Sequence, residues 1–232
     1  MSEAAAIERR FQGVFVVVEG IDGSGSTTHT KLLGKALRKR GLKVVETCEP
    51  SPGPIGALIR QVLQRRLFVA DATGPRAFAW STMALLFAAD RMDHLDSTVV
   101  PALREGAVVL SDRYDLSSLA YQSVTAPSGD KVVPWIRELN AAALRPDLTV
   151  VIDVPVEVAE ERRASRGGIE EMFESRELQT RLCAVYGEAE RLVPLDRVAH
   201  VTGVGAVSDV AASILNTVVA LDPAFFQERS AI

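Results

Sequence analysis

The sequence contains few cysteines and histidines, and this excludes several kinds of site. Cys48 and Cys183 are its two cysteines, and they show no CxxC spacing. Two such thiols cannot form a disulfide framework or, by themselves, a zinc site, so we expect both to be reduced. His29, His94 and His200 also lack the spacing that is typical of a metal site.

Long apolar runs are absent as well. The run Val14–Val18 is far shorter than the ~18 residues that a membrane-spanning helix needs, and Ala77–Ala89 is interrupted by Ser81 and Thr82. The first ten residues carry acidic and basic side chains without an apolar run, which argues against a secretory signal. The sequence therefore predicts a cytoplasmic protein with no membrane partner.

The chain has no excess of positive charge. Its formal net charge is -4 at pH 7, and its pI is near 5.5. A general nucleic-acid binder would need a basic surface for its phosphate contacts. We therefore expect no nucleic-acid partner, and any anionic ligand must be bound by a local group of residues.

Length and composition fit one globular core. The chain has 232 residues, of which 47% are hydrophobic and 24% are charged, as in ordinary folded proteins. Short apolar runs alternate with amphipathic segments, and this alternation predicts a parallel α/β sheet. The predicted strands are Val14–Val18, Val44–Val45, Ala107–Leu110, Val150–Ile152 and a weaker Ala199–Val201. The predicted helices after the first are Ile55–Arg66, Ala77–Arg104 with an interruption at Pro101, Pro134–Leu144, Val156–Arg166, Phe173–Leu192 and Val207–Leu221.

A glycine-rich loop joins the first strand to the first helix. Residues 19–28 read EGIDGSGSTT, and strand, glycine loop and helix form the context of a P-loop. Backbone N–H groups converge on phosphate oxygens in such a loop, and the helix N-terminus adds partial positive charge. The predicted phosphate-binding residues are Gly20, Asp22, Gly23, Ser24, Gly25, Ser26, Thr27 and Thr28. The alternative is a glycine-rich turn that binds no nucleotide.

Three positions decide how this loop would work. Ser26 stands where the G-x-x-x-x-G-K-[ST] motif has a lysine that reaches the outer phosphates. Thr27 supplies the hydroxyl that holds magnesium in such loops. Asp112 ends a buried run, where P-loop enzymes place a carboxylate near the metal. Asp153 ends a second run, but we expect it to lie near the start of the next helix, so the predicted metal ligands are Thr27 and Asp112.

Three further segments match motifs that occur together in one family. They are Asp112–Gln122 (DRYDLSSLAYQ), Leu85–Arg91 (LLFAADR) and Glu49–Arg60 (EPSPGPIGALIR). The chain therefore resembles the thymidylate kinases over nearly all of residues 13–222. The resemblance implies one P-loop NTPase domain over 13–222 with a three-layer α/β/α fold around a central five-stranded parallel sheet. Terminal tails at 1–12 and 223–232 would flank it.

The resemblance also implies an activity. It is the phosphorylation of dTMP to dTDP, with ATP as phosphate donor, Mg²⁺ as cofactor and a homodimer as the assembled state. Two alternatives stay open. One is a catalytically weak relative that binds nucleotide and acts as a sensor or partner protein. The other is a kinase of another deoxynucleotide or deoxynucleoside.

By resemblance, five residues contact the base and sugar of dTMP. Phe87 would stack on thymine and Arg91 would hydrogen-bond its edge, since a ring face suits a planar base and a guanidinium suits carbonyl acceptors. Ser117 and Ser118 would lie near the base, and Tyr121 beside the deoxyribose. Structural alternatives are a core role for Phe87, a surface ion pair for Arg91 and an interior position for Tyr121.

The remaining residues concern the transfer itself. By resemblance, Asp22 reaches the sugar 3′-hydroxyl or the metal, and Arg113 bridges the donor and acceptor phosphates; its structural alternative is a salt bridge with Asp112. A cation must replace the missing lysine, since Ser26 carries no charge. We expect Arg166, in a lid at about 162–173, to supply it and to act on the transferring group. Arg162 or Arg163 comes second, and Lys31 is the nearest lysine in sequence.

Overall fold

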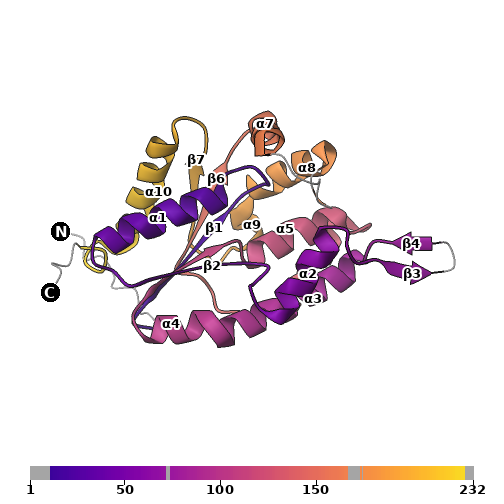
Figure 1. The fold of residues 1–232 in the computed structure, drawn as a ribbon, viewed down its shortest axis with the longest axis horizontal. Helices are drawn as coiled ribbons and strands as arrows, with labels where there is room; N and C mark the ends of the chain where they lie inside the picture. Colours follow the sequence, from indigo (N-terminus) through magenta and orange to yellow (C-terminus); the bar gives the residue numbers. More distant parts are fainter. Residues whose placement is uncertain (1–10, 72–73, 167–172, 174, 228–232) are drawn as a thin grey trace.

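The central strand is hydrophobic from Val14 to Val18 because both of its faces are covered. The computed structural model describes residues 11–71, 74–166, 173 and 175–227. Five parallel strands form its sheet in the order β2-β5-β1-β6-β7 (Figure 1). They are β1 Val14–Glu19, β2 Val44–Cys48, β5 Val108–Asp112, β6 Leu148–Asp153 and β7 Val198–Thr202. The predicted five-stranded parallel sheet is confirmed.

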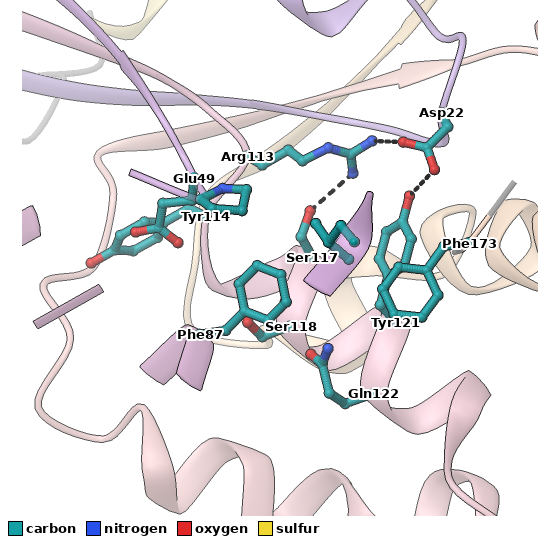
Figure 2. A pocket seen from close by; sticks show the side chains of 12 residues that line it. Asp22, Glu49, Phe87, Arg113, Tyr114, Ser117, Ser118, Tyr121, Gln122 and Phe173 are labelled. Carbon is teal, nitrogen blue, oxygen red and sulfur yellow. Dashed lines mark hydrogen bonds and ion pairs between the residues drawn. The ribbon is translucent and has the colours of Figure 1, made fainter. Parts of the chain in front are cut away.

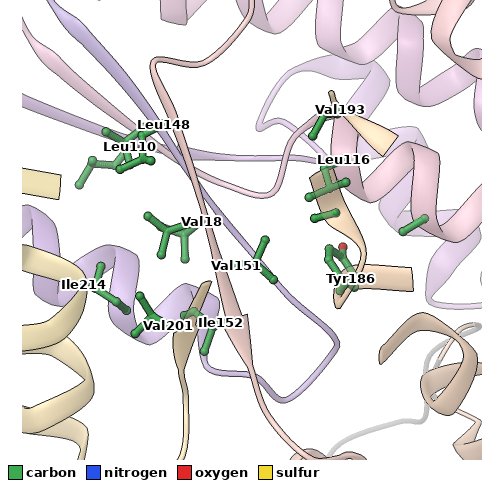
Figure 3. Packing of buried hydrophobic residues seen from close by; sticks show 14 of the residues in the cluster. Val18, Leu110, Leu116, Leu148, Val151, Ile152, Tyr186, Val193, Val201 and Ile214 are labelled. Carbon is green, nitrogen blue, oxygen red and sulfur yellow. The ribbon is translucent and has the colours of Figure 1, made fainter. Parts of the chain in front are cut away.

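The alternating side chains of β1 enter two separate cores. Val14, Val16 and Val18 belong to a large cluster that includes residues of α1 and α10; Figure 3 shows Val18 with Ile214 of α10. Phe15 and Val17 belong to a second cluster, with Val99 and Leu103 from the opposite face. Helices therefore cover both faces of the sheet, as the predicted three-layer architecture requires.

Ten α-helices lie within the described residues. They are α1 Ser26–Lys39, α2 Pro54–Leu63, α3 Trp80–His94, α4 Val100–Arg104, α5 Asp115–Thr125, α6 Val133–Leu139, α7 Val156–Arg166, α8 Arg176–Tyr186, α9 Ala189–Leu192 and α10 Val207–Leu221. The bounds of α7 and α10 agree with the prediction, whereas the predicted helix over 173–192 is divided into α8 and α9. None of the described helices is both long and apolar enough to cross a bilayer.

The predicted long helix over 77–104 is interrupted earlier than expected. A π-helical turn, Leu95–Val99, separates α3 from α4, and Pro101 lies inside the first turn of α4. Proline lacks an N–H, and its ring clashes with the carbonyl four residues earlier in a regular helix. The wider turn before Pro101 accommodates both effects, so the irregularity precedes the proline.

A small hairpin was not predicted. Strands β3 Val69–Asp71 and β4 Gly74–Arg76 pair antiparallel, and they project from the body beside α2 and α3 (Figure 1). Three residues per strand are too few to show a two-residue hydrophobic period. The fold around the sheet is thus predictable from pattern, while this hairpin is not.

We expect Ile214→Ala to destabilise the protein by about 2–5 kcal/mol, because the side chain of Ile214 is fully buried in the core cluster and its truncation leaves a cavity. Asn216→Ala, on the exposed side of the same helix, should change the unfolding free energy by less than about 0.5 kcal/mol. Urea unfolding followed by circular dichroism measures both. Equal effects of the two substitutions would contradict the packing described.

Candidate active site

The glycine loop lies at the carboxyl end of β1 and leads into α1. Gly20, Gly23 and Gly25 have φ values of 150°, 92° and 95°, which residues other than glycine rarely adopt. At Gly23 a Cβ would lie 2.4 Å from the carbonyl oxygen of Ala159, so the backbone of α7 packs directly on the loop. Ser26 begins α1, whose first N–H groups have no partners within the helix. The loop therefore has the backbone form of an anion site.

A cavity of about 420 Å³ opens in front of this loop, and we call it the loop cavity. It is lined by Asp22, Gly23, Gly25, Ser26, Thr27, Thr28, His29, Arg113, Arg162, Arg163, Gly203, Gly205, Val207 and Val210. Six of the predicted phosphate-binding residues are thus in its wall. Gly20 and Ser24 also belong to the loop, but they are buried and do not line the cavity.

A second cavity lies beside the first, and we call it the aromatic cavity (Figure 2). It is lined by Asp22, Glu49, Pro50, Leu63, Phe87, Arg113, Tyr114, Ser117, Ser118, Tyr121, Gln122 and Phe173. Its volume is about 140 Å³, and an engineered cavity of about 150 Å³ in another protein binds benzene. This cavity can therefore take a single planar ring.

Arg113 and Asp22 line both cavities. Arg113 Nη2 donates to Asp22 Oδ1 at 2.5 Å, and Tyr121 Oη donates to Asp22 Oδ2 at 3.0 Å (Figure 2). Gln179 Nε2 also donates to Oδ2, at 2.9 Å. The salt-bridge partner of Arg113 is therefore Asp22 rather than Asp112, and the pair forms the boundary between the cavities.

The backbone at Arg113 is unusual and is held on both sides. Its φ is 72°, which is uncommon for a residue with a side chain. Arg113 N donates to Val18 O at 2.9 Å, and Ser111 Oγ donates to Arg113 O at 2.7 Å. Such strain persists where the surroundings over-determine it, and it is concentrated at functional sites.

Arg91 lies behind the aromatic cavity and does not line it. Its side chain is fully buried, and its Nη2 donates to Glu49 Oε2 at 2.7 Å and to Ser118 Oγ at 3.0 Å. Its Nη1 donates to Asn140 Oδ1. Among the described residues its Nε has no partner. Arg91 thus supports Glu49 and Ser118, which do line the cavity, and its contact with a base stays a prediction.

The two predicted metal ligands lie side by side, Thr27 in the first turn of α1 and Asp112 at the carboxyl end of β5. Thr27 Oγ1 donates to Asp112 Oδ2. Asp112 Oδ1 is buried and has no hydrogen-bond partner within the described part of the chain. Magnesium is typically bound by one or two carboxylates together with phosphate oxygens and water. A hydroxyl next to an unpaired carboxylate oxygen fits this ion.

The structure separates the candidates for the missing cation. Arg163 Nη1 donates to Asp22 O, and Arg162 donates to Ser24 O at 3.2 Å and to Gly203 O at 2.8 Å, so both are fixed at the loop cavity. Lys31 lines an adjacent cavity together with Thr27, Asp112 and Arg113. Arg166 ends α7, but its side chain and most of the predicted lid, 167–172, lie outside the described residues.

Several residues at the site were missed by the sequence analysis. Gln122 lay in a quoted motif, and its buried Oε1 has no partner among the described residues. Glu49 also lay in a quoted motif. No sequence motif pointed to Phe173 or Gln179 as site residues, because both lie more than 50 residues further along the sequence than the other residues of the aromatic cavity. Glu19 ends β1, and burial raises the pKa of its carboxyl group to about 7.

Comparison with known proteins gives a consistent result. A family model described as "Thymidylate kinase" matches residues 18–195. A "Probable thymidylate kinase" of Pyrococcus abyssi is 40% identical over 171 residues, covering 74% of this chain and 80% of that protein. Another from Thermococcus gammatolerans is 38% identical over 206 residues, covering 89% and 96%. A "Thymidylate kinase" of Pelotomaculum thermopropionicum is 41% identical over 156 residues, covering 67% and 69%.

These relatives match along most of their own length, and the range that the family model matches, 18–195, contains Asp22 and Arg113. The sequence motifs, the parallel sheet and the glycine loop point in the same direction. The chain belongs to the thymidylate kinase family.

Proposed function

We propose that the protein transfers the γ-phosphoryl group of ATP to dTMP, giving ADP and dTDP. The observation that carries this proposal is that Arg113 and Asp22 line both cavities. A guanidinium between two phosphate sites can neutralise charge on the group in transit, and phosphoryl transfer needs positioning and charge stabilisation more than covalent chemistry.

ATP binds in the loop cavity. The free N–H groups at the start of α1 receive its phosphates, and the cavity continues past Gly203 and Gly205 to Val207 and Val210. This end offers apolar surface to a planar base. Thr27 and Asp112 would hold Mg²⁺, which would neutralise phosphate charge when bound; the hydroxyl beside an unpaired carboxylate oxygen supports this role.

The monophosphate binds in the aromatic cavity. Phe87 offers a ring face to thymine, and Gln122 Oε1 and the Ser118 hydroxyl offer polar contacts to its edge. Tyr121 and Asp22 lie at the boundary, on the side of the sugar and its phosphate. The acceptor therefore points its phosphate at Arg113.

The direct test is an ADP-release assay with ATP, Mg²⁺ and a panel of nucleoside monophosphates and nucleosides. dTMP should be the preferred acceptor. Turnover of a different acceptor in preference to dTMP, or nucleotide binding without turnover, would contradict the proposal.

We expect Phe87→Ala to raise KM for dTMP by ~10–100-fold, since stacking a base on an aromatic ring is worth about 1–3 kcal/mol. Leu86→Ala is a matched control, because Leu86 packs on the same cluster as Phe87 but does not line the cavity. Both variants lose packing, so both should melt earlier. An equal rise in KM for the control would assign the effect to folding rather than to the base.

A cation from α7 replaces the missing P-loop lysine in this proposal. Arg163 lines the loop cavity, and among the described residues only its Nη1 is hydrogen-bonded, to the carbonyl of Asp22. Arg162 is tied by both terminal nitrogens to backbone carbonyls. Arg163 is therefore the better placed of the two to meet a phosphate.

We expect Arg163→Ala to lower kcat by ~10²–10³-fold, as for loss of one preorganised stabiliser of developing charge. KM for dTMP should change little, because Arg163 does not line the aromatic cavity. Ser26→Lys should restore part of the loss, and Lys31→Ala should stay within about threefold of the parent. A kcat for Arg163→Ala within the same threefold would return the role to Arg166 or Lys31.

We also propose a cytoplasmic homodimer whose partners are small nucleotides. Helices α2 and α3 pack against each other and expose Leu58 and Leu85, which are 39% and 51% accessible. Two free thiols suit a reducing compartment, and the acidic net charge does not suit binding to nucleic acid.

Sedimentation equilibrium of the parent protein should give the mass of two chains, and that of the Leu85→Glu variant should give the mass of one.

A further inference from the structure

Glu19 is a buried carboxylate next to the site, and it is not exposed in either cavity. It is the last residue of β1, directly before the glycine loop, and its side chain is fully buried. It lines neither the loop cavity nor the aromatic cavity. A buried acid is costly unless donors surround it, so its hydrogen bonds define its role.

Four donors converge on this carboxylate. Its Oε1 accepts from Tyr114 N at 2.8 Å and from Ser117 N at 3.2 Å. Its Oε2 accepts from Ser117 Oγ at 2.6 Å and from Tyr186 Oη at 3.1 Å. One oxygen therefore holds the backbone at the start of α5, and the other holds two hydroxyl groups from α5 and α8.

The same two hydroxyl oxygens accept from Arg113. Its Nη1 donates to Ser117 Oγ at 3.2 Å and to Tyr186 Oη at 3.3 Å. Ser117 Oγ and Tyr186 Oη also lie 2.9 Å apart, and either hydroxyl can donate to the other. An ionised Glu19 favours donation of both protons to Oε2, which leaves lone pairs on both hydroxyl oxygens for Arg113. In that arrangement donation runs from Arg113 through the hydroxyls to the carboxylate.

We infer that Glu19 is a positioning residue for phosphoryl transfer, whose ionised carboxylate orients the hydroxyls of Ser117 and Tyr186 and through them Arg113. The inference rests on the proposed function. Protonation would break the arrangement at one atom. Oε1 is occupied by two backbone amides, so the proton would lie on Oε2 and be donated to a hydroxyl oxygen. It would compete there with Arg113 Nη1.

Burial of Glu19, opposed by the charge of Arg113, places this protonation near neutral pH. Arg113 faces it from the turn after β5 and Tyr186 from α8, while Tyr114 donates its backbone N–H and Asp22 lies beyond Arg113. Burial raises the pKa of Glu19 to about 7, although Arg113 and the hydrogen bonds oppose the rise. Burial also raises the pKa of Tyr186, so the tyrosine stays neutral. Arg113 remains charged.

Activity and stability should therefore change in opposite directions with pH. Between about 4.5 and 7 the folded state binds a proton at Glu19 that the unfolded state has released. This contribution to stability is lost as pH rises through the folded pKa. In contrast, the fraction of molecules in which Glu19 is ionised and Arg113 is correctly oriented increases as the pH rises. A residue that served folding alone would not separate the two trends.

The test is Glu19→Gln, compared with the parent from pH 5.5 to 8.5. The amide oxygen can still accept from the backbone, whereas the amide N–H₂ reproduces the protonated form. We expect kcat at pH 8 to fall ~10²-fold, the scale of a small misplacement at a reacting centre. The rise of kcat near pH 7 should disappear in the variant. Substrate phosphate titrates near pH 6 in both enzymes, so the difference between their profiles is the measurement.

A double-mutant cycle separates positioning from folding. If Glu19 acts through Arg113, then Glu19→Gln should add less than about threefold to the loss caused by Arg113→Ala. The full loss in both backgrounds would overturn the inference. Asp115→Asn is the matched control: it removes a buried carboxylate in the first turn of α5 that pairs with Arg145 and, among the described residues, has no hydrogen bond to Arg113. It should lower the melting temperature and keep the pH profile.

Two further results would be interpreted differently: failure of Glu19→Gln to fold, and an inactive parent. Where Glu19→Gln fails to fold, Tyr186→Phe removes one hydroxyl without disturbing the backbone bonds, and it should lower kcat about tenfold with an unchanged circular dichroism spectrum. An unchanged kcat would overturn the inference. A parent that does not phosphorylate dTMP would contradict the proposed function itself, whereas an active parent with additive losses contradicts only the role of Glu19.

Discussion

The ion pair between Arg113 and Asp22 is the interaction on which the site depends. Asp22 belongs to the loop after β1 and Arg113 to the turn after β5, so the pair joins two segments 91 residues apart. The sheet brings them together, because β1 and β5 are parallel neighbours with Val18 opposite Asp112. Loops at the carboxyl ends of such strands meet at one edge, and both cavities open at this edge.

Charge at this edge is organised in pairs. Glu49 holds Arg91, Asp22 holds Arg113, and Glu19 is tied to Arg113 through hydroxyls. An acidic protein can therefore bind anionic nucleotides, because its arginines are fixed locally while the rest of the surface carries the negative excess. Pairing also orients each guanidinium before a ligand arrives, which reduces the reorganisation that binding requires.

Local patterns were predictable and distant contacts were not. The run Val14–Val18, the glycine loop and the bounds of α7 and α10 follow from residues adjacent in sequence. Arg91 has a surface or base-facing interpretation in sequence, and only the packing of Glu49 and Asn140 around it shows that it is enclosed. Tyr186 and Gln179 reach the site across 73 and 157 residues, to Arg113 and Asp22. No local periodicity encodes such pairs.

The close contact between Gly23 and the carbonyl of Ala159 has a consequence for how the enzyme cycles. The backbone of α7 rests on the loop without room for a Cβ, so any shift of the helix must displace the loop. Hydrogen bonds to loop and turn carbonyls keep Arg162 and Arg163 in place at the loop cavity. The positive field at the loop cavity is thus a standing property of the protein. In the proposed reaction, product ADP meets the same field as substrate ATP, and its departure competes with that attraction in every cycle.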